Sequence, residues 1–117
     1  MRNKKIKRLP EFDRDVKKLI KKYPTIEKDL ENVVNVIFVY PFARPPFSYE
    51  INSLGLKTIV IKIKKIASAS FNGRGGHSGF RIIYAWMPEM QEVILIEVYH
   101  KSIQALEDRK RIFHNFN

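Results

Sequence analysis

Three side chains with different chemistry follow one another at residues 99–101. Tyr99, His100 and Lys101 supply a phenol, an imidazole and an ammonium group at the end of a predicted strand. Cleavage of RNA by its own 2′-hydroxyl needs a proton acceptor, cationic stabilisation of the phosphorane and a proton donor for the leaving 5′-oxygen. His100 could donate that proton near neutral pH, and Lys101 could bind the phosphate. A histidine at a strand end is more often structural, so the tripeptide alone leaves both roles open.

Cations also interrupt the predicted strands. Between residues 58 and 66, alternation of apolar and polar side chains places Lys62 and Lys64 on the sheet face opposite the isoleucines. The alternation of the next strand can place Arg81 on that same face. Like charges on a rigid sheet are unfavourable unless an anion neutralises them, and phosphate is the simplest anion. The alternatives are that the lysines protect a sheet edge and that Arg81 pairs with Glu97 on the neighbouring strand.

The composition favours a polyanionic partner. The 117 residues contain 22 Lys and Arg against 12 Asp and Glu, a formal net charge of +10. Nucleic acid is the favoured partner class because each neutralised phosphate releases condensed counterions, although membrane-surface proteins and partners of acidic proteins share such a charge. Cysteine is absent, and neither a metal-site spacing nor a nucleotide-binding glycine motif is present. We therefore expect no metal and no cofactor.

The length and the apolar content predict one domain over residues 1–117. Apolar residues make up 44% of the chain and charged residues 29%, which suits a single packed core. No apolar run approaches the roughly 20 residues that span a bilayer, and the first eight residues do not resemble a secretory signal. We expect a cytoplasmic protein without a membrane partner.

The N-terminal part has the periodicity of two helices. Apolar residues recur at helical spacing over residues 11–23 and 26–37, and the break at Pro24 is so short that the helices should form an antiparallel hairpin. Thr25 is the predicted N-cap of the second helix. The polar side of the first helix carries four lysines: Lys17, Lys18, Lys21 and Lys22. For this run a solvated face is favoured over direct contact with RNA.

Strands dominate the second half of the sequence. After an irregular loop at residues 41–53, strands are predicted at residues 58–66, 79–86 and 93–99, and the short links between them favour antiparallel pairing. A helix beginning at Ser102 is expected to pack four apolar side chains: Ile103, Leu106, Ile112 and Phe113. Residues 4–9 could add an edge strand.

These elements predict an α+β fold with the order β-α-α-β-β-β-α. The helical hairpin would cover one face of a curved antiparallel sheet and leave the opposite face for another purpose. The cations of the strands would lie on this uncovered face.

Five segments together resemble the RelE/ParE toxins of bacterial type II toxin-antitoxin systems, and within them the RelE, HigB and YoeB nucleases. The segments are residues 12–23, 26–30, 62–64, 73–84 and 99–102. The most specific piece is Gly79-Phe80-Arg81-Ile82-Ile83-Tyr84. The resemblance extends over nearly the whole chain and implies a RelE-like, microbial-RNase-like fold. It also implies entry into the ribosomal A site beside the 16S rRNA, cleavage of the mRNA codon there, and inhibition by a cognate antitoxin.

The resemblance also suggests catalytic roles for individual residues. Arg81 matches the arginine that contacts the scissile phosphate, and Lys62 and Lys64 match the basic pair of the RelE strand. His100 resembles the histidine that YoeB-like members use as general acid, and Glu50 could be the carboxylate base of those members. As general acid, His100 should contribute about a hundredfold to ten-thousandfold to cleavage.

Further positions complete the predicted site. Lys101 would help to stabilise the pentacoordinate phosphate, although YoeB-like members often have Tyr there. RNA-binding roles are predicted for four residues: Lys57, Lys65, Arg74 and Tyr99. The ParE branch shares this fold yet inhibits DNA gyrase without RNA chemistry. The alternatives are therefore a gyrase inhibitor, a catalytically inactive antitoxin-binding homologue, and a plain RNA-binding module.

Overall fold

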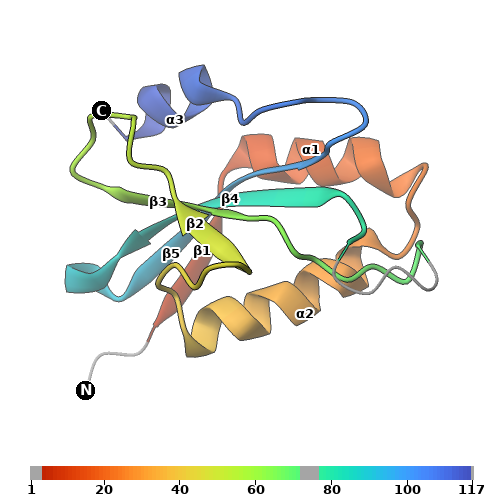
Figure 1. Cartoon of the computed structure of the whole chain (residues 1–117), viewed down its shortest axis with the longest axis horizontal. Coiled ribbons are helices and arrows are strands. Elements are labelled where there is room, and N and C mark those ends of the chain that lie inside the picture. The colour runs from red at the N-terminus through yellow and green to blue at the C-terminus, as the bar shows by residue number, and fades with distance from the viewer. Residues whose placement is uncertain (1–3, 72–76, 117) are drawn as a thin grey trace.

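A five-stranded sheet and three helices make up the described part of the chain (Figure 1). The computed structural model describes residues 4–71 and 77–116. The strands are β1 (Lys5–Arg8), β2 (Ser48–Glu50), β3 (Ile59–Ile63), β4 (Phe80–Met87) and β5 (Glu92–His100). The helices are α1 (Pro10–Ile20), α2 (Ile26–Val39) and α3 (Arg109–Asn115), and a short 3-10 turn (Pro88–Met90) joins β4 to β5.

The sheet is mixed. Its strands lie in the order β1-β5-β4-β3-β2, and every neighbouring pair is antiparallel except β1 and β5. The predicted α+β class and the edge strand at residues 4–9 are confirmed, but the prediction of an antiparallel sheet is wrong at this edge. A parallel pair needs a long connection, and the chain between β1 and β5 supplies it through the helical hairpin and three further strands.

The strand β2 lies where the sequence predicts an irregular loop. It pairs with β3, and Tyr49 is the register partner of Lys62. Its three residues, Ser48-Tyr49-Glu50, follow several prolines and have no apolar alternation, so no periodic signal marks them as a strand. The observed order of elements is therefore β-α-α-β-β-β-β-α.

The helical hairpin forms as the apolar spacing predicts. Both helices are buried along one stripe, which consists of Phe12, Val16, Leu19, Ile26, Leu30, Val33 and Ile37. Thr25 occupies the N-cap position of α2, but its hydroxyl lies 3.0 Å from the Asp29 carboxylate and does not cap the backbone. The buried Asp29 also accepts hydrogen bonds from the Ser68 hydroxyl and the Ala69 amide, at 2.5 and 3.2 Å. These bonds tie the start of α2 to the segment after β3.

Both faces of the sheet carry an apolar core. The hairpin face contains Ile61, Ile63, Phe80, Ile82, Tyr84, Trp86, Val93, Leu95 and Val98. The opposite face contains a second cluster of Leu54, Val60, Ile83, Ala85, Ile96, Tyr99 and Ile112. Ile112 belongs to α3, which lies on the other side of the sheet from α2 (Figure 1). The face that the sequence predicts to be uncovered is thus partly covered by the C-terminal helix.

The C-terminal helix is shorter than predicted. Residues 101–108 are irregular, and α3 begins only after Asp108, whose carboxylate accepts the Arg111 amide at 3.1 Å. Ile103 and Leu106 are 68% and 63% exposed, so two of the four predicted packing residues do not pack. Phe113 is exposed too, and Ile112 alone of the four is buried. Ser and Asp are about equally good N-caps, but Ser102 is bonded to the His100 ring through its amide, whereas the Asp108 carboxylate accepts the amide of the first turn.

Candidate functional site

The cations of the central strands share one sheet face. In the register of β3 and β4, Lys62 lies opposite Ile83, and in that of β4 and β5, Arg81 lies opposite Tyr99. Ile83 and Tyr99 belong to the apolar cluster on the face away from the helical hairpin. Lys64 follows β3 on the same side, with its ammonium 5.2 Å from the ring centre of Tyr49. The predicted placement of Lys62, Lys64 and Arg81 on one face is confirmed.

The charge of Lys62 is paired. Its ammonium lies 3.0 Å from the Glu107 carboxylate, and the two side chains are only 13% and 4% exposed. Burial by itself lowers the pKa of Lys62, but interactions with the Tyr99 hydroxyl and the Glu107 carboxylate outweigh it. Burial raises the pKa of Glu107, but interactions led by that with Lys62 outweigh it. The pKa of Lys62 is therefore raised and that of Glu107 lowered. Glu107 also lies 3.2 Å from Arg109, so a single carboxylate holds two cations.

Arg81 keeps its charge available. Its guanidinium donates to the main-chain carbonyls of Lys64 and Phe80, at 3.1 Å each. The alternative that Arg81 pairs with Glu97 is wrong: the two are diagonal neighbours in the register, but among the described residues they form no ion pair. Glu97 instead accepts hydrogen bonds from the Gln104 amide and from the Asp108 backbone amide. Among the described residues, Arg81 and Lys64 form no ion pair.

His100 lies on the opposite face from Arg81. Its register partner is Phe80, and the imidazole is 6% exposed. The ring stacks on Tyr23 and Phe71, with ring centres 5.4 and 5.3 Å away, and meets Phe80 edge-on at 5.1 Å. The structure therefore does not bring His100 together with Lys62 and Arg81, and the predicted convergence of these three side chains is wrong.

Both ring nitrogens of His100 are engaged within the protein. The backbone amide of Ser102 donates to Nδ1 at 3.1 Å, so this nitrogen acts as an acceptor. The other nitrogen, Nε2, then carries the proton and donates it to the Ser78 carbonyl at 2.8 Å. An imidazole with this packing connects the ends of β4 and β5. The geometry offers no support for the predicted role as general acid.

Gly79 permits this close packing. Its φ of +93° lies in the left-handed region, and a Cβ atom built there would lie 2.7 Å from Nε2 of His100. The glycine of the segment Gly79-Phe80-Arg81 is thus required by the backbone conformation and by the histidine ring against it.

The remaining predicted site residues are dispersed. Glu50 lies opposite Ile61, on the hairpin side of the sheet and away from Lys62. Lys57 precedes β3 and lines a hollow with Trp86, whereas Lys65 is exposed beyond the other end of that strand. Arg74 lies outside the described residues.

Tyr99 and Lys101 lie near Arg81. The backbone amide of Lys101 donates to the Gly79 carbonyl at 2.9 Å, two residues beyond the pairing of Tyr99 with Arg81. Tyr99 is buried together with its hydroxyl, and the Lys62 ammonium lies 5.9 Å from the centre of its ring. Burial raises the pKa of that hydroxyl, which stays protonated at neutral pH.

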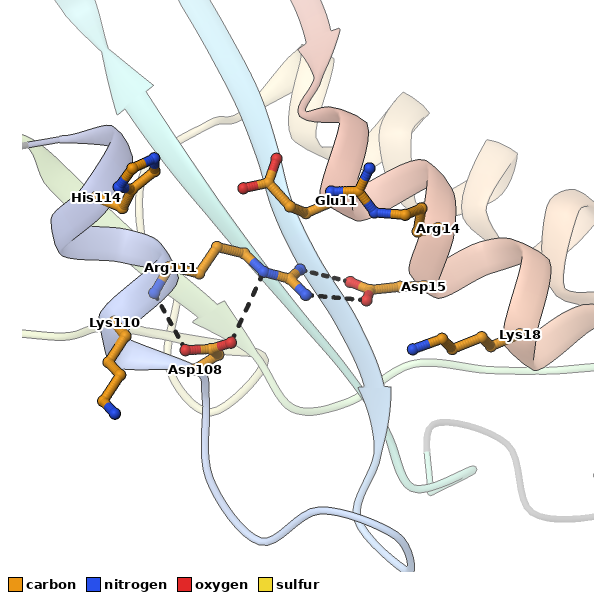
Figure 2. Close-up of a pocket in the computed structure, with 8 residues that line it drawn as sticks. All are labelled: Glu11, Arg14, Asp15, Lys18, Asp108, Lys110, Arg111 and His114. Carbon is orange, nitrogen blue, oxygen red and sulfur yellow. Dashed lines mark hydrogen bonds and ion pairs between the residues drawn. The ribbon is translucent and has the colours of Figure 1, made fainter.

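A second concave region lies between α1 and α3 (Figure 2). It has a volume of ≈ 470 Å³ and is lined by Glu11, Arg14, Asp15, Lys18, Asp108, Lys110, Arg111 and His114. At its floor, the Arg111 guanidinium makes two bonds to the Asp15 carboxylate, at 2.7 and 3.1 Å. The sequence predicted neither this hollow nor its ion pair, because the two partners are 96 positions apart.

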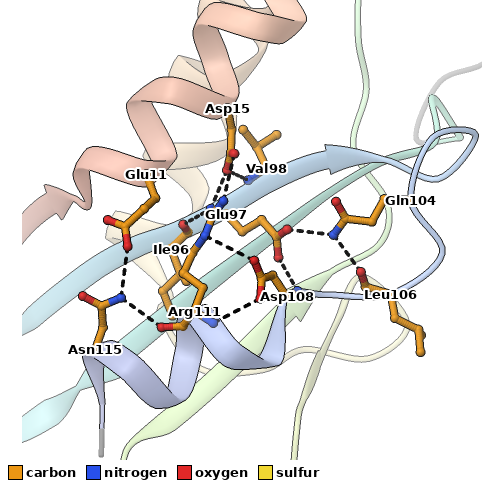
Figure 3. A network of polar contacts seen from close by, with 10 residues as sticks. All are labelled: Glu11, Asp15, Ile96, Glu97, Val98, Gln104, Leu106, Asp108, Arg111 and Asn115. Carbon is orange, nitrogen blue, oxygen red and sulfur yellow. Dashed lines mark hydrogen bonds and ion pairs between the residues drawn. The ribbon is translucent and has the colours of Figure 1, made fainter.

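The same ion pair closes an open strand edge (Figure 3). β1 pairs with β5 only as far as Leu95, which leaves the outer edge of residues 96–100 without a strand partner. There the Asp15 carboxylate accepts the Val98 amide at 3.2 Å, and Arg111 donates to the Ile96 carbonyl at 2.9 Å. A side-chain acceptor from Asp15 and a side-chain donor from Arg111 thus bond to backbone groups of β5 that a neighbouring strand would otherwise pair with.

Neither membrane nor metal features are present in residues 4–71 and 77–116. No helix there has the length and apolar character needed to cross a bilayer. The same residues contain no cluster of three His, Cys, Asp or Glu side chains that could hold a metal ion. No family model matches the chain, and comparisons with curated proteins and with solved structures gave no significant match.

Proposed function

We propose that this protein is the toxin of a type II toxin-antitoxin system, of RelE/ParE type, and that it cleaves mRNA in the ribosomal A site. The observation that carries the proposal is the position of Lys62, Lys64 and Arg81 on one sheet face, away from the helical hairpin. These are the positions at which the motif resemblance places phosphate contacts. The basic net charge supports the same class of ligand.

The proposed reaction is intramolecular attack within the RNA. The 2′-oxygen attacks the adjacent phosphorus and loses its proton, the bond from phosphorus to the 5′-oxygen breaks, and that oxygen takes up a proton. The products are a 2′,3′-cyclic phosphate and a 5′-hydroxyl. The phosphorane gains negative charge along the way, so fixed cations stabilise it more than they stabilise the substrate. Arg81 and Lys64, which have no ion pair among the described residues, are suited to this task.

His100 has no part in this chemistry. Its ring faces the helical hairpin, and both nitrogens bond within the protein. Catalysis would rest on cationic stabilisation by Arg81, Lys64 and Lys101 and on orientation of the substrate by the ribosome. The further parts of the proposal are a cognate antitoxin as inhibitory partner, the 16S rRNA as contact in the ribosome, and the cytoplasm as location.

The burial of His100 favours a second candidate function. Because the imidazole of His100 is not on the cationic face, this face lacks the predicted general acid and suits binding of a nucleic acid or protein as well as RNA cleavage. A ParE-like inhibitor of DNA gyrase or a catalytically inactive RNA-binding homologue would need only that binding. The position of Glu50 on the hairpin side of the sheet points in the same direction.

Toeprinting of a translating reaction separates these functions. The parent protein should create new stops inside A-site codons, and Arg81→Ala should slow their formation by about 10²–10³-fold because it removes a charge that stabilises the phosphorane. Arg44→Ala is the matched control, since Arg44 stacks on Tyr40 and Phe47 in the loop before β2. Intact mRNA together with inhibited supercoiling would support the gyrase function. Intact mRNA with normal supercoiling would leave only the binding module.

A further inference from the structure

Cations from two distant parts of the chain meet at the hollow between α1 and α3. Arg14 and Lys18 project from α1 and Lys110 and His114 from α3, so that both helices contribute cationic or basic side chains to the lining (Figure 2). None of the three cations Arg14, Lys18 and Lys110 forms an ion pair within the described residues. Positive charges that line one concave site favour the binding of an anion there.

The three carboxylates of the hollow all accept hydrogen bonds from groups within the protein. Asp15 is bonded twice by Arg111 and accepts the Val98 amide as well. Asp108 caps α3 through the Arg111 amide and also lies 3.9 Å from the Arg111 guanidinium. Glu11 is the one remaining carboxylate, and it accepts from the Asn115 amide at 3.4 Å. Four Arg and Lys side chains line the hollow against these three carboxylates, so the hollow keeps a positive net charge.

A row of cations along α1, here called the lysine row and made of Arg14, Lys18 and Lys21, extends this positive charge beyond the hollow. Arg14, Lys18 and Lys21 are spaced at i, i+4 and i+7, so they lie on one side of the helix and span about 10 Å along its axis. All three are exposed, as is Lys17 between them. A rigid helix that carries such a row can contact several phosphates along one strand.

The lining of the hollow favours folded RNA over a single strand. Proteins that hold single strands stack bases on aromatic side chains, and this hollow has no Phe, Tyr or Trp in its lining. Double-stranded RNA is recognised mostly through its backbone and shape, for which cations on a rigid scaffold suffice. The apolar stripe of α1 is buried in the core and only Ile20 of its large apolar side chains is exposed, so α1 offers little of the apolar area that membrane-surface helices insert.

We propose that the hollow between α1 and α3, together with the lysine row of α1, is a second nucleic-acid-binding surface, and that its ligand is the phosphodiester backbone of folded RNA. The surface is separate from the cationic sheet face, because Lys62, Lys64 and Arg81 do not line the hollow. The inference rests on the proposed function to the extent that the ribosome supplies such RNA. It assigns RNA binding to the lysines of α1, which the sequence pattern predicts to form a solvated helix face.

The test compares two triple variants with the same loss of charge. The site variant is Arg14→Gln, Lys18→Gln and Lys110→Gln, and the control variant is Lys5→Gln, Lys7→Gln and Lys28→Gln on β1 and α2. Binding to an RNA hairpin is measured over a range of salt concentrations. The slope of log K against log salt should become shallower by about two to three for the site variant, since each lost phosphate contact changes it by about one. The control variant should retain nearly the parental slope.

Several results would overturn the proposal. An unchanged slope for the site variant, with folding verified by circular dichroism, would show that these cations do not contact RNA. An equal change in the control variant would show that net charge alone sets the affinity. Tighter parental binding to a DNA duplex of the same sequence would assign the surface to another ligand.

The experiments distinguish a failure of the nuclease proposal from a failure of the proposed RNA-binding surface. Arg81→Ala should slow the formation of new toeprints by about 10²–10³-fold and should change the salt slope of RNA-hairpin binding by no more than about one, against two to three for the site variant. A parent protein that binds the hairpin through α1 and α3 but cuts no mRNA would retain the second surface and refute the nuclease.

Discussion

Arg111 and Asp15 bond to one another through two hydrogen bonds, and the same two side chains bond to the backbone of β5. The pair joins α1 to α3 across an unpaired strand edge, so it acts at once as an ion pair and as a substitute strand. Its side chains are only 15% and 16% exposed. Interaction with Asp15 is the main cause of the raised pKa of Arg111, which stays charged throughout the accessible pH range.

Asp15→Ala should lower the free energy of unfolding by about 2–4 kcal/mol, because it leaves the half-buried Arg111 charge and the Val98 amide without their acceptor. Urea denaturation measures this loss. Asp13→Ala on the same helix is the control and should cost less than about 0.5 kcal/mol, since Asp13 is largely exposed and lies 3.4 Å from Arg8. An equal loss in the two variants would contradict the edge-closing role.

The alternation of side chains along the strands correctly predicted that Lys62 and Arg81 share a sheet face, but it gave no correct placement for His100. Alternation within β3 and β4 is a local property, so the shared face of Lys62 and Arg81 could be inferred from the sequence. In β5 the register shifts: Ile83 pairs with Glu97 but Tyr84 pairs with Leu95, so Ile96 is an extra residue. Uninterrupted alternation from Val93 would put His100 on the face of Arg81. The bulge reverses this, and no residue type in the sequence marks it.

Glu107 could not have been predicted for a different reason. It is 45 positions away from Lys62, and contacts between such distant residues depend on the path of the whole chain. The irregular segment 101–108 contains exposed Ile103 and Leu106, whose spacing predicted a helix there. Polar contacts of Glu97 with Gln104 and Asp108 hold the segment instead, and apolar periodicity contains no information about them.

Gly79→Ala should destabilise the protein more than Gly55→Ala does. Both glycines have positive φ, which costs an alanine about 1–2 kcal/mol, but only Gly79 has atoms within contact distance of a new Cβ. The nearest is Nε2 of His100 at 2.7 Å. Thermal unfolding of both variants measures the difference. In a His100→Ala background, most of the excess loss at Gly79 should disappear, and its persistence would mean that backbone strain alone is responsible.

His100→Ala should reduce stability but not the cleavage rate of folded molecules. The substitution removes a ring that contacts Tyr23, Phe71 and Phe80, at a cost of about 2–4 kcal/mol. Toeprinting at a temperature where the variant is folded should give rates within about threefold of the parent. Loss of a general acid would instead slow cleavage by about 10²–10⁴-fold, and such a result would restore the catalytic role of this histidine.

Glu107→Gln should reduce stability in a defined pH window. The pKa of Glu107 is lowered on folding, so its contribution is present above its unfolded pKa of about 4.3 and is lost as the pH falls through the folded value. The pKa of Lys62 is raised, so the contribution of Lys62 is present below its unfolded pKa of about 10.4 and is lost only as the pH rises beyond it. At pH 7 we expect a loss of about 1–3 kcal/mol, which should shrink as the pH falls below about 4.3 and vanish only below the lowered folded pKa. A loss that is independent of pH would point to packing instead of charge.

The same substitution should affect RNA binding in the opposite direction. In the parent protein, the Lys62 ammonium is neutralised by Glu107 at 3.0 Å, so a phosphate on the sheet face gains little from it. Glu107→Gln frees that charge, and the slope of log K against log salt for RNA binding should steepen by up to about one. Glu31→Gln, an exposed carboxylate 3.9 Å from Lys28 on α2, controls for the change in net charge. If RNA binding weakens together with stability, Glu107 holds Lys62 in its RNA-binding position, and the ion pair itself is part of the site.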